Sequence, residues 1–198
     1  MNNRFEILVI GGGHAGIEAA YSAAKMGCRT ALLSMSLRTM GKPSCNPSIG
    51  GTAKGHLVKE IDALGGAMGL LADRGGIQFK MLNKSKGPAV WSPRSQIDKD
   101  LYPLYVLSFL SKVKNLTLIE DSIYEILIKN DKVIGAICGK NELLYAEKII
   151  LCAGTFLNGK MYTGVHTTIG GRVGEPAAAG LSEKLRGFGF EIGRLKTG

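Results

Sequence analysis

The stretch FEILVIGGGHAGIEAAY, residues 5–21, decides the fold of this chain. Residues 6–10 are almost wholly apolar, which predicts a strand buried on both faces of a parallel sheet. Gly11, Gly13 and Gly16 follow at the spacing G-x-G-x-x-G, and apolar residues then recur at helical spacing. This order of strand, glycine turn and helix is typical of a dinucleotide-binding unit.

Each glycine of the turn has its own predicted role. Gly11 allows the tight turn off the strand, Gly13 lets the backbone approach a pyrophosphate, and Gly16 lets the helix pack on the strand. The helix N-terminus offers unpaired N–H groups and the positive end of its dipole to the phosphates. The alternative is a glycine-rich turn that binds nothing.

The composition describes a globular chain with an excess of positive charge. Of 198 residues, 45% are hydrophobic and 21% are charged, which argues against disorder. The formal net charge of +9 suits a polyanionic partner such as RNA, but also many ordinary basic enzymes. No apolar run is long enough to span a bilayer and no secretory signal is evident, so we expect a cytoplasmic protein without membrane contact.

The cysteines and histidines predict neither a metal site nor a disulfide framework, because no C-x-x-C pair occurs and the histidines are scattered. Cys45 lies in a loop rich in glycine and proline, close in sequence to Lys42, Lys54 and Lys59. Positive surroundings lower a thiol pKa and favour the thiolate. The alternative is a thiol that only packs.

The second strand is expected at residues 29–34, after Gly27 ends the first helix. A dinucleotide-binding unit usually has an acidic residue at the end of this strand, which binds the ribose. Ser34 and Ser36 stand there instead, which departs from a plain NAD-dependent dehydrogenase.

Residues 37–115 form an insertion far longer than a crossover requires. Its basic segment, residues 76–88, contains Phe79 and is followed by Trp91. Basic residues beside these aromatic side chains suit RNA backbone contacts and base stacking. A solvated basic loop is the alternative. A helix is expected to follow with Pro93 in its first turn.

After the insertion the sequence predicts a third parallel strand, a β-meander, a separate buried strand that returns to the main sheet, and a last helix. The expected ranges are 116–121, then 122–128, 133–139 and 143–146, then 148–155, and finally 176–188. A fingerprint strand, a β-meander and a returning apolar strand are the layout of two-dinucleotide-binding flavoproteins. The expected fold class is therefore α/β: a Rossmann-like FAD-binding domain with a parallel sheet and a β-meander crossover. Residues 1–36 and 116–198 form this domain, incomplete at its C-terminus, and residues 37–115 form the insertion.

Six stretches in unbroken order cover most of the chain: GGGHAGIEAA (11–20), SCNPSIGGTAKGHLVKEIDALGG (44–66), GIQFKMLNKSKGPAV (76–90), GTFLNGKMYTG (154–164), GGRVGEPAAAGLSEKL (170–185) and GRLKTG (193–198). They resemble the tRNA uridine 5-carboxymethylaminomethyl modification enzymes, the GidA/MnmG flavoproteins. The motifs CNPSIGG and KGHLVKEIDALGG are far more specific for this family than a glycine fingerprint is. The resemblance, together with the basic stretch that ends the sequence, implies an N-terminal fragment of a longer protein.

The resemblance implies FAD as cofactor. The family's FAD loop falls on Gly11, Gly12, Gly13, His14, Ala15 and Gly16, with an adenine contact on Ile123 and a further contact on Ala178. His14 is then a residue at the helix start that contacts the cofactor. Members lack the acidic ribose residue, so the serines after the second strand fit the family. Trp91 stands where Arg would be equally expected.

The implied activity modifies C5 of the wobble uridine in tRNA. A one-carbon unit from methylenetetrahydrofolate is joined to glycine or ammonia, and NADH supplies reducing equivalents through FAD. Cys45 matches the family's CNP cysteine and is the candidate catalytic or redox thiol. A homodimer and an MnmE-type GTPase partner are implied, and this fragment alone is expected to be inactive.

Three alternatives stay open at this point. One is a generic FAD-dependent NAD(P)H oxidoreductase, although the C-x-x-x-x-C redox pair it would use is absent. A second is the folate-dependent tRNA uridine C5-methyltransferase, against which the CNPSIGG loop argues. The third is an RNA-binding scaffold that keeps flavin for structure only.

Overall fold

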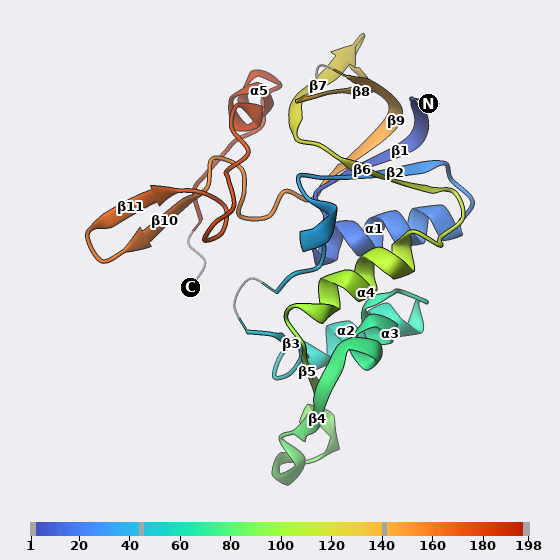
Figure 1. The fold of residues 1–198 in the computed structure, drawn as a ribbon, viewed down its shortest axis with the longest axis vertical. Helices are drawn as coiled ribbons and strands as arrows, with labels where there is room; N and C mark the ends of the chain where they lie inside the picture. Colours follow the sequence, from blue (N-terminus) through green and yellow to red (C-terminus); the bar gives the residue numbers. More distant parts are fainter. Residues whose placement is uncertain (1–2, 44–45, 140–141, 196–198) are drawn as a thin grey trace.

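The structure is a computed structural model, and it describes residues 3–43, 46–139 and 142–195. Its centre is a six-stranded sheet with the strand order β6-β2-β1-β9-β8-β7 (Figure 1). The strands are β1 Arg4–Ile10, β2 Thr30–Ser34, β6 Leu116–Glu120, β7 Ile123–Lys129, β8 Lys132–Cys138 and β9 Leu143–Leu151. Strands β6, β2, β1 and β9 are parallel, and β8 runs antiparallel between β9 and β7.

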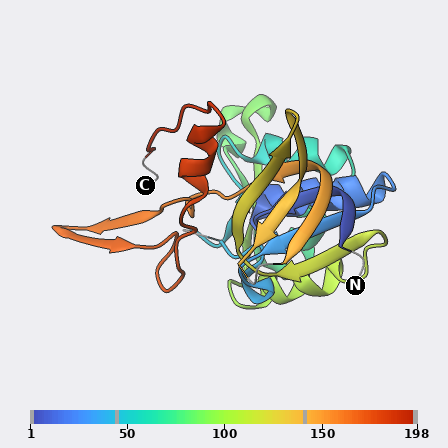
Figure 2. The same cartoon turned by 90° about the horizontal axis from the view of Figure 1, so that it is seen from above.

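Both faces of the parallel strands are covered. Val9 and Leu32 point to one face, where they pack with α1 (His14–Lys25) and α4 (Leu101–Leu110). Leu8, Ile10 and Leu33 point to the other face, which the curled meander β7–β8 and α5 (Leu181–Gly187) cover (Figure 2). This confirms the prediction of a parallel-sheet strand that is buried on both sides where it meets the glycine turn.

The segment between β2 and β6 builds a second layer of structure. It contains α2, α3 and α4 and a small antiparallel sheet with the order β3-β5-β4 (Figure 1). The bounds are η1 Leu37–Thr39, β3 Ser48–Gly50, α2 Gly55–Ala63, α3 Met68–Gly75, β4 Gly76–Leu82, η2 Lys84–Lys86, η3 Pro88–Val90 and β5 Ser92–Ile97. Helices α3 and α4 pack on each other.

The prediction that a helix starts near Pro93 was wrong. Residues 92–97 form the central strand of the small sheet, and α4 begins only at Leu101. The Asp98 carboxylate accepts hydrogen bonds from the N–H groups of Asp100 and Leu101, both at 2.9 Å. This side chain therefore fixes where the helix starts, as Asp residues commonly do at helix N-termini.

Two further expectations from the sequence also need correction. The third meander strand and the returning strand are one strand, β9, which pairs antiparallel with β8 at its start and parallel with β1 along most of its length. Helix α5 starts at Leu181 rather than Pro176, because Gly180 has a φ of +90° and Ala178 bridges to Leu157. Between β9 and α5 a hairpin, β10 (Lys160–Thr163) and β11 (His166–Ile169), projects from the body (Figure 2).

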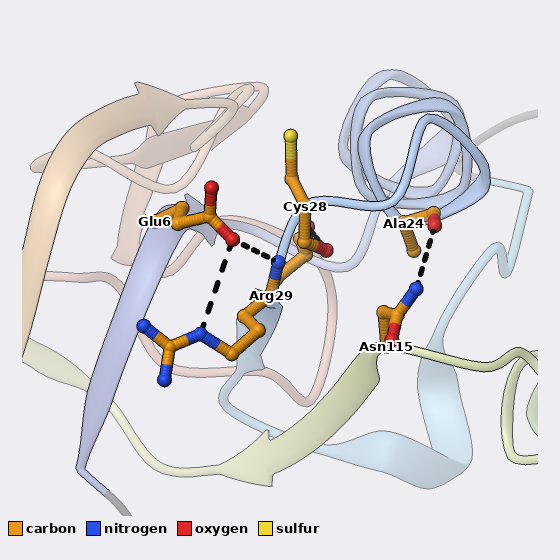
Figure 3. A network of polar contacts seen from close by, with 6 residues as sticks. Glu6, Ala24, Cys28, Arg29 and Asn115 are labelled. Atoms are coloured by element: carbon orange, nitrogen blue, oxygen red, sulfur yellow. Dashed lines mark hydrogen bonds and ion pairs between the residues drawn. The ribbon is translucent and has the colours of Figure 1, made fainter.

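The amino edge of the parallel sheet is held together by local polar contacts (Figure 3). The Glu6 carboxylate accepts a hydrogen bond from the Arg29 N–H at 2.8 Å and lies 3.9 Å from its guanidinium Nε. The Asn115 carbonyl accepts from Thr30 N–H at 2.9 Å, which joins β6 to β2. No helix in the described part of the chain is long and apolar enough to cross a membrane.

Candidate functional site

The loops that follow the parallel strands meet at the opposite, carboxyl edge of the sheet. The glycine turn follows β1, Ser34 ends β2, and Cys152 follows β9. Their backbones are joined there: Gly11 N–H donates to Leu33 O at 2.8 Å, and Cys152 N–H donates to Ile10 O at 2.7 Å. In open α/β sheets this edge is the usual place for a ligand.

Three of the glycines are required by contacts within the protein. A Cβ on Gly16 would overlap the carbonyl oxygen of Gly11, and a Cβ on Gly11, whose φ is +113°, would overlap that of Cys152. A Cβ on Gly12 would lie 2.6 Å from Ser34 Oγ and 2.8 Å from Met40 Cγ. The absence of a side chain at these positions therefore lets the helix, the strand and the neighbouring loops pack against one another at van der Waals distance.

Gly13 is different. It is exposed, and a Cβ built on it meets no heavy atom within 4 Å. Its φ of −76° and ψ of 179° are also accessible to other residues. Packing in this chain therefore gives no reason for glycine at position 13, and the open space is what a backbone that approaches a pyrophosphate needs.

The N-terminus of α1 faces this open space without a side-chain cap. Gly13 is its N-cap residue and makes no side-chain hydrogen bond, while its carbonyl accepts from Ile17 N–H at 2.9 Å. Ala15 in the first turn is exposed. An uncapped helix start with glycine at the N-cap offers its N–H groups to an anion.

The loop that follows β2 packs directly on the glycine turn. Gly41 N–H donates to Gly12 O at 2.9 Å, and Met40 is almost fully buried. Gly41 has a φ of +69°, and a Cβ on it would press against Val106, Ile17 and Tyr102. The residues that lead toward Cys45 therefore start at the candidate site itself. Cys45 lies outside the described residues.

The segment after β9 brings Ala178 to the same edge. Ala178 N–H donates to Phe156 O at 2.8 Å, and Asn158 N–H donates to Ala178 O at 2.9 Å. Thr155 Oγ1 donates to Gly171 O at 2.9 Å. These bonds tie the glycine-rich loop of residues 170–174 to the end of β9, next to Gly11.

Arg172, in that loop, is a cation that the sequence analysis missed. Its Nη1 atom is buried and makes no hydrogen bond among the described residues, although it lies 3.4 Å from the Glu175 carboxylate. Its guanidinium lies 5.8 Å from the Phe156 ring centroid. In the sequence, Arg172 is visible only as a single basic residue between the glycines of GGRVGEP. No local pattern predicts that its Nη1 atom is buried.

His14 is partly buried at the start of α1, with its ring centroid 6.1 Å from that of Tyr102. Burial lowers the pKa of His14 from its ordinary value, and the positive charge of Arg172 lowers it further. The imidazole is therefore neutral at neutral pH.

Ile123 begins β7 at the same edge, but its side chain is buried in the core between sheet and meander. The serines that end β2 are engaged locally, since Ser34 Oγ donates to Ser36 O at 3.0 Å. The acidic side chain at this edge comes from β6: Glu120 accepts from Leu37 N–H at 2.8 Å. Sequence spacing alone does not reveal this carboxylate.

Two of the other cysteines have the environment of packed thiols. Burial raises the pKa of Cys138 to about 11, with the negative charges of Asp121 and Glu142 adding to the effect. Burial also raises the pKa of Cys152. Neither thiol is a reactive thiolate at neutral pH, so both are expected to pack rather than to react.

The parallel sheet with its meander, the glycine turn and the uncapped helix define a Rossmann-like α/β fold of the kind that FAD-dependent oxidoreductases have. A crystal structure of pqsL, a probable FAD-dependent monooxygenase from Pseudomonas aeruginosa, has this fold: the TM-score is 0.54 at 14% identity, over 74% of this chain and 41% of that one. A family model described as "Glucose inhibited division protein A" matches residues 6–198. The chain belongs to this GidA family.

Closer relatives agree with this assignment. The chain is 50% identical, over 98% of its length, to the tRNA uridine 5-carboxymethylaminomethyl modification enzyme MnmG of Wolinella succinogenes. It superposes on GidA of Aquifex aeolicus with a TM-score of 0.91 and 47% identity over 96% of its length. In both comparisons it spans 31% of the relative. These results confirm the family resemblance and the fold class predicted from the sequence.

Proposed function

We propose that this chain is the cofactor-binding part of a tRNA-modifying flavoprotein that adds a (carboxymethyl)aminomethyl group at C5 of the wobble uridine. The observation that carries the proposal is the open glycine turn with the uncapped N-terminus of α1, which can bind a pyrophosphate. It occurs in a chain that is 50% identical to MnmG. In this assignment residues 1–36 and 116–198 are the FAD-binding domain, and residues 37–115 are an insertion in it.

The residues at the carboxyl edge fit FAD. The turn Gly11–Gly16 and the N–H groups of the uncapped α1 would hold the pyrophosphate, since Gly13, alone among the four glycines of this turn, has open space where a Cβ would stand. Arg172, whose Nη1 atom is buried, supplies a positive charge that lowers the pKa of His14 in addition to the larger effect of burial. Ile123 and Ala178 remain proposed contacts for the rest of the cofactor. When bound, FAD would carry reducing equivalents from NADH.

Cys45 is the proposed nucleophile. C5 of uridine is a poor nucleophile until a group adds at C6, and a thiolate can make that adduct. The thiolate forms a bond to C6, the electron pair of the C5–C6 double bond moves toward C5 and O4, and C5 can then attack a one-carbon electrophile. Loss of the C5 proton and expulsion of the thiolate restore the ring.

The remaining components follow from the family assignment. The one-carbon unit would come from methylenetetrahydrofolate and the amino group from glycine or ammonia. We propose that the full-length protein acts in the cytoplasm as a homodimer with an MnmE-type GTPase, and that this fragment alone is inactive. The geometry of the candidate FAD site supports this assignment.

The test replaces Cys45 by Ser in the full-length protein. We expect FAD content to stay at the wild-type level and the modified wobble nucleoside to disappear from tRNA digests analysed by mass spectrometry. Cys28→Ser is the matched control, since Cys28 is a half-buried thiol on the loop before β2, and should modify tRNA normally. A Cys45→Ser protein with normal nucleoside levels would remove Cys45 from the mechanism.

A further inference from the structure

The positive charge of the chain is concentrated in one segment. Residues 37–115 contain twelve Lys or Arg residues and five Asp or Glu residues, and so carry +7 of the net charge of +9. The rest of the chain, which builds the six-stranded sheet and the cofactor site, is close to neutral. The excess charge therefore serves something other than binding the dinucleotide.

Within this segment the charge gathers on the hairpin formed by β4, η2, η3 and β5, residues 76–97, which we call the basic hairpin. It contains Lys80, Lys84, Lys86 and Arg94 and no acidic residue. Lys80 and Arg94 are direct cross-strand partners. Like charges directly opposite each other destabilise a pair of strands. A polyanion bound between them would relieve that repulsion.

Large apolar side chains are exposed on the same hairpin. Phe79 is 60% exposed and Trp91 is 43% exposed. The lysines at positions 80, 84 and 86 are exposed too, and the ion pairs formed by the described residues do not include them. Trp91 bonds the backbone of Lys84, so an open aromatic ring lies next to lysines that form no such ion pair. This is the pattern of a surface that contacts phosphates and stacks on bases.

The tip of the basic hairpin is held in a defined conformation. Trp91 Nε1 donates to Lys84 O at 3.2 Å, and Asn83 Nδ2 donates to Val90 O at 3.2 Å, so the two sides of the tip are joined. Asn83 adopts a left-handed φ of 60°, which sets the turn into η2. The tip points away from the six-stranded sheet (Figure 1). The indole is therefore presented on an ordered platform that projects from the body.

We propose that the basic hairpin binds the anticodon arm of the substrate tRNA, with the lysines on phosphates and Trp91 on an unpaired loop base. The inference rests on the proposed function, and it assigns the RNA contact to a surface separate from the cofactor site. Unpaired loop bases are the part of RNA that aromatic side chains can stack on. An acidic protein partner would use the lysines but would leave the exposed Trp91 ring without a role.

The first test measures binding of a fluorescent anticodon stem-loop RNA to the full-length protein by anisotropy, across a range of salt concentrations. The variant Lys80→Glu/Lys84→Glu/Lys86→Glu should lose at least about tenfold in affinity. Its slope of log K against log salt should fall by about three, roughly one per lost phosphate contact. The control Lys129→Glu/Lys132→Glu/Lys148→Glu makes the same charge change on exposed residues of the main sheet, and should bind as the wild type does.

A second pair of variants tests stacking. Trp91→Ala should weaken RNA binding by about tenfold, the lower part of the range for loss of one stacked base. Trp91→Phe keeps an aromatic face and should retain most of the affinity. FAD content of each purified variant reports whether the fold is intact, because the hairpin lies outside the cofactor site.

The outcomes separate this inference from the proposed function. If the wild type binds the stem-loop and the triple lysine variant binds it equally well, the hairpin is not the RNA site, while the proposed function stands. Equal affinity of the wild type for duplex DNA of the same length would also overturn the inference, because it would mean general polyanion binding. If the wild-type protein binds neither the stem-loop nor whole tRNA, the proposed function fails as well.

Discussion

The carboxylate of Glu18, in the second turn of α1, accepts a hydrogen bond of 2.6 Å from the backbone N–H of Met68, the first residue of α3. The neighbouring N–H of Ala67 donates to the same carboxylate at 3.0 Å. A residue of the glycine-turn helix thus caps a helix that lies fifty positions later in the chain. The segment between β2 and β6 is thereby fixed to the helix whose N-terminus forms the candidate cofactor site.

Removing this cap should destabilise the protein. We expect Glu18→Ala to lower the free energy of unfolding by about 1–2 kcal/mol, the usual cost of losing a helix cap made by a charged acceptor. Glu18→Gln keeps an oxygen acceptor and should lose less. Denaturant unfolding followed by circular dichroism measures the difference. Glu147→Ala, on an exposed position of β9, is the matched control and should change stability by less than about 0.5 kcal/mol.

The glycine turn yields a prediction that separates folding from cofactor binding. Gly13→Val should unfold close to the wild-type temperature, because the space around position 13 is open and only the small cost of an apolar N-cap residue remains. It should lose at least about tenfold in FAD affinity. Gly16→Ala should unfold at a lower temperature, because its Cβ would overlap the Gly11 carbonyl. Thermal unfolding without FAD and flavin fluorescence titration give the two readouts. A Gly13→Val protein that binds FAD normally would show that the fingerprint has been misread.

The parts of the fold that the sequence predicts are those specified by local patterns. The glycine spacing and the apolar period around residues 5–21 identify β1, the turn and α1 without any knowledge of partners. The strand beginning at Leu116 and the gap between the expected meander strands 122–128 and 133–139 are likewise local. Asn130 and Asp131 in that gap both have the positive φ that a tight turn needs.

The parts that the sequence does not predict depend on distant residues. Residues 92–97 become a strand because they pair with β3 and β4 on either side, while Pro93 alone resembles a helix start. Strand β9 is continuous because β8 and β1 pair with its two halves. Arg172 becomes part of the site only because its loop folds back on Phe156. Partners of this kind cannot be seen in a window of a few residues.

Arg172 should contribute to cofactor binding through its charge. We expect Arg172→Ala to weaken FAD binding by about ten- to a hundredfold, since a hydrogen bond to a charged group contributes about 1.5–3 kcal/mol. Arg172→Lys should recover part of the affinity. Arg186→Ala, an exposed arginine on α5, is the control and should bind FAD as the wild type does. Unchanged FAD affinity in Arg172→Ala would mean that the guanidinium serves only Glu175 and Phe156.

His14 should make the stability of the FAD-free protein depend on pH. Its pKa in the folded protein lies below the ordinary value of 6.5, through burial first and the charge of Arg172 second. Between these two pKa values the unfolded chain binds more protons than the folded protein, so the free energy of unfolding should fall as pH decreases below about 6.5. His14→Gln cannot take up this proton and should show a shallower loss, whereas His166→Gln, on the exposed hairpin strand β11, should follow the wild type. Urea unfolding of the three proteins between about pH 5 and 8 measures this. Parallel curves for wild type and His14→Gln would mean that His14 titrates alike in both states, and that neither its burial nor Arg172 affects it in solution.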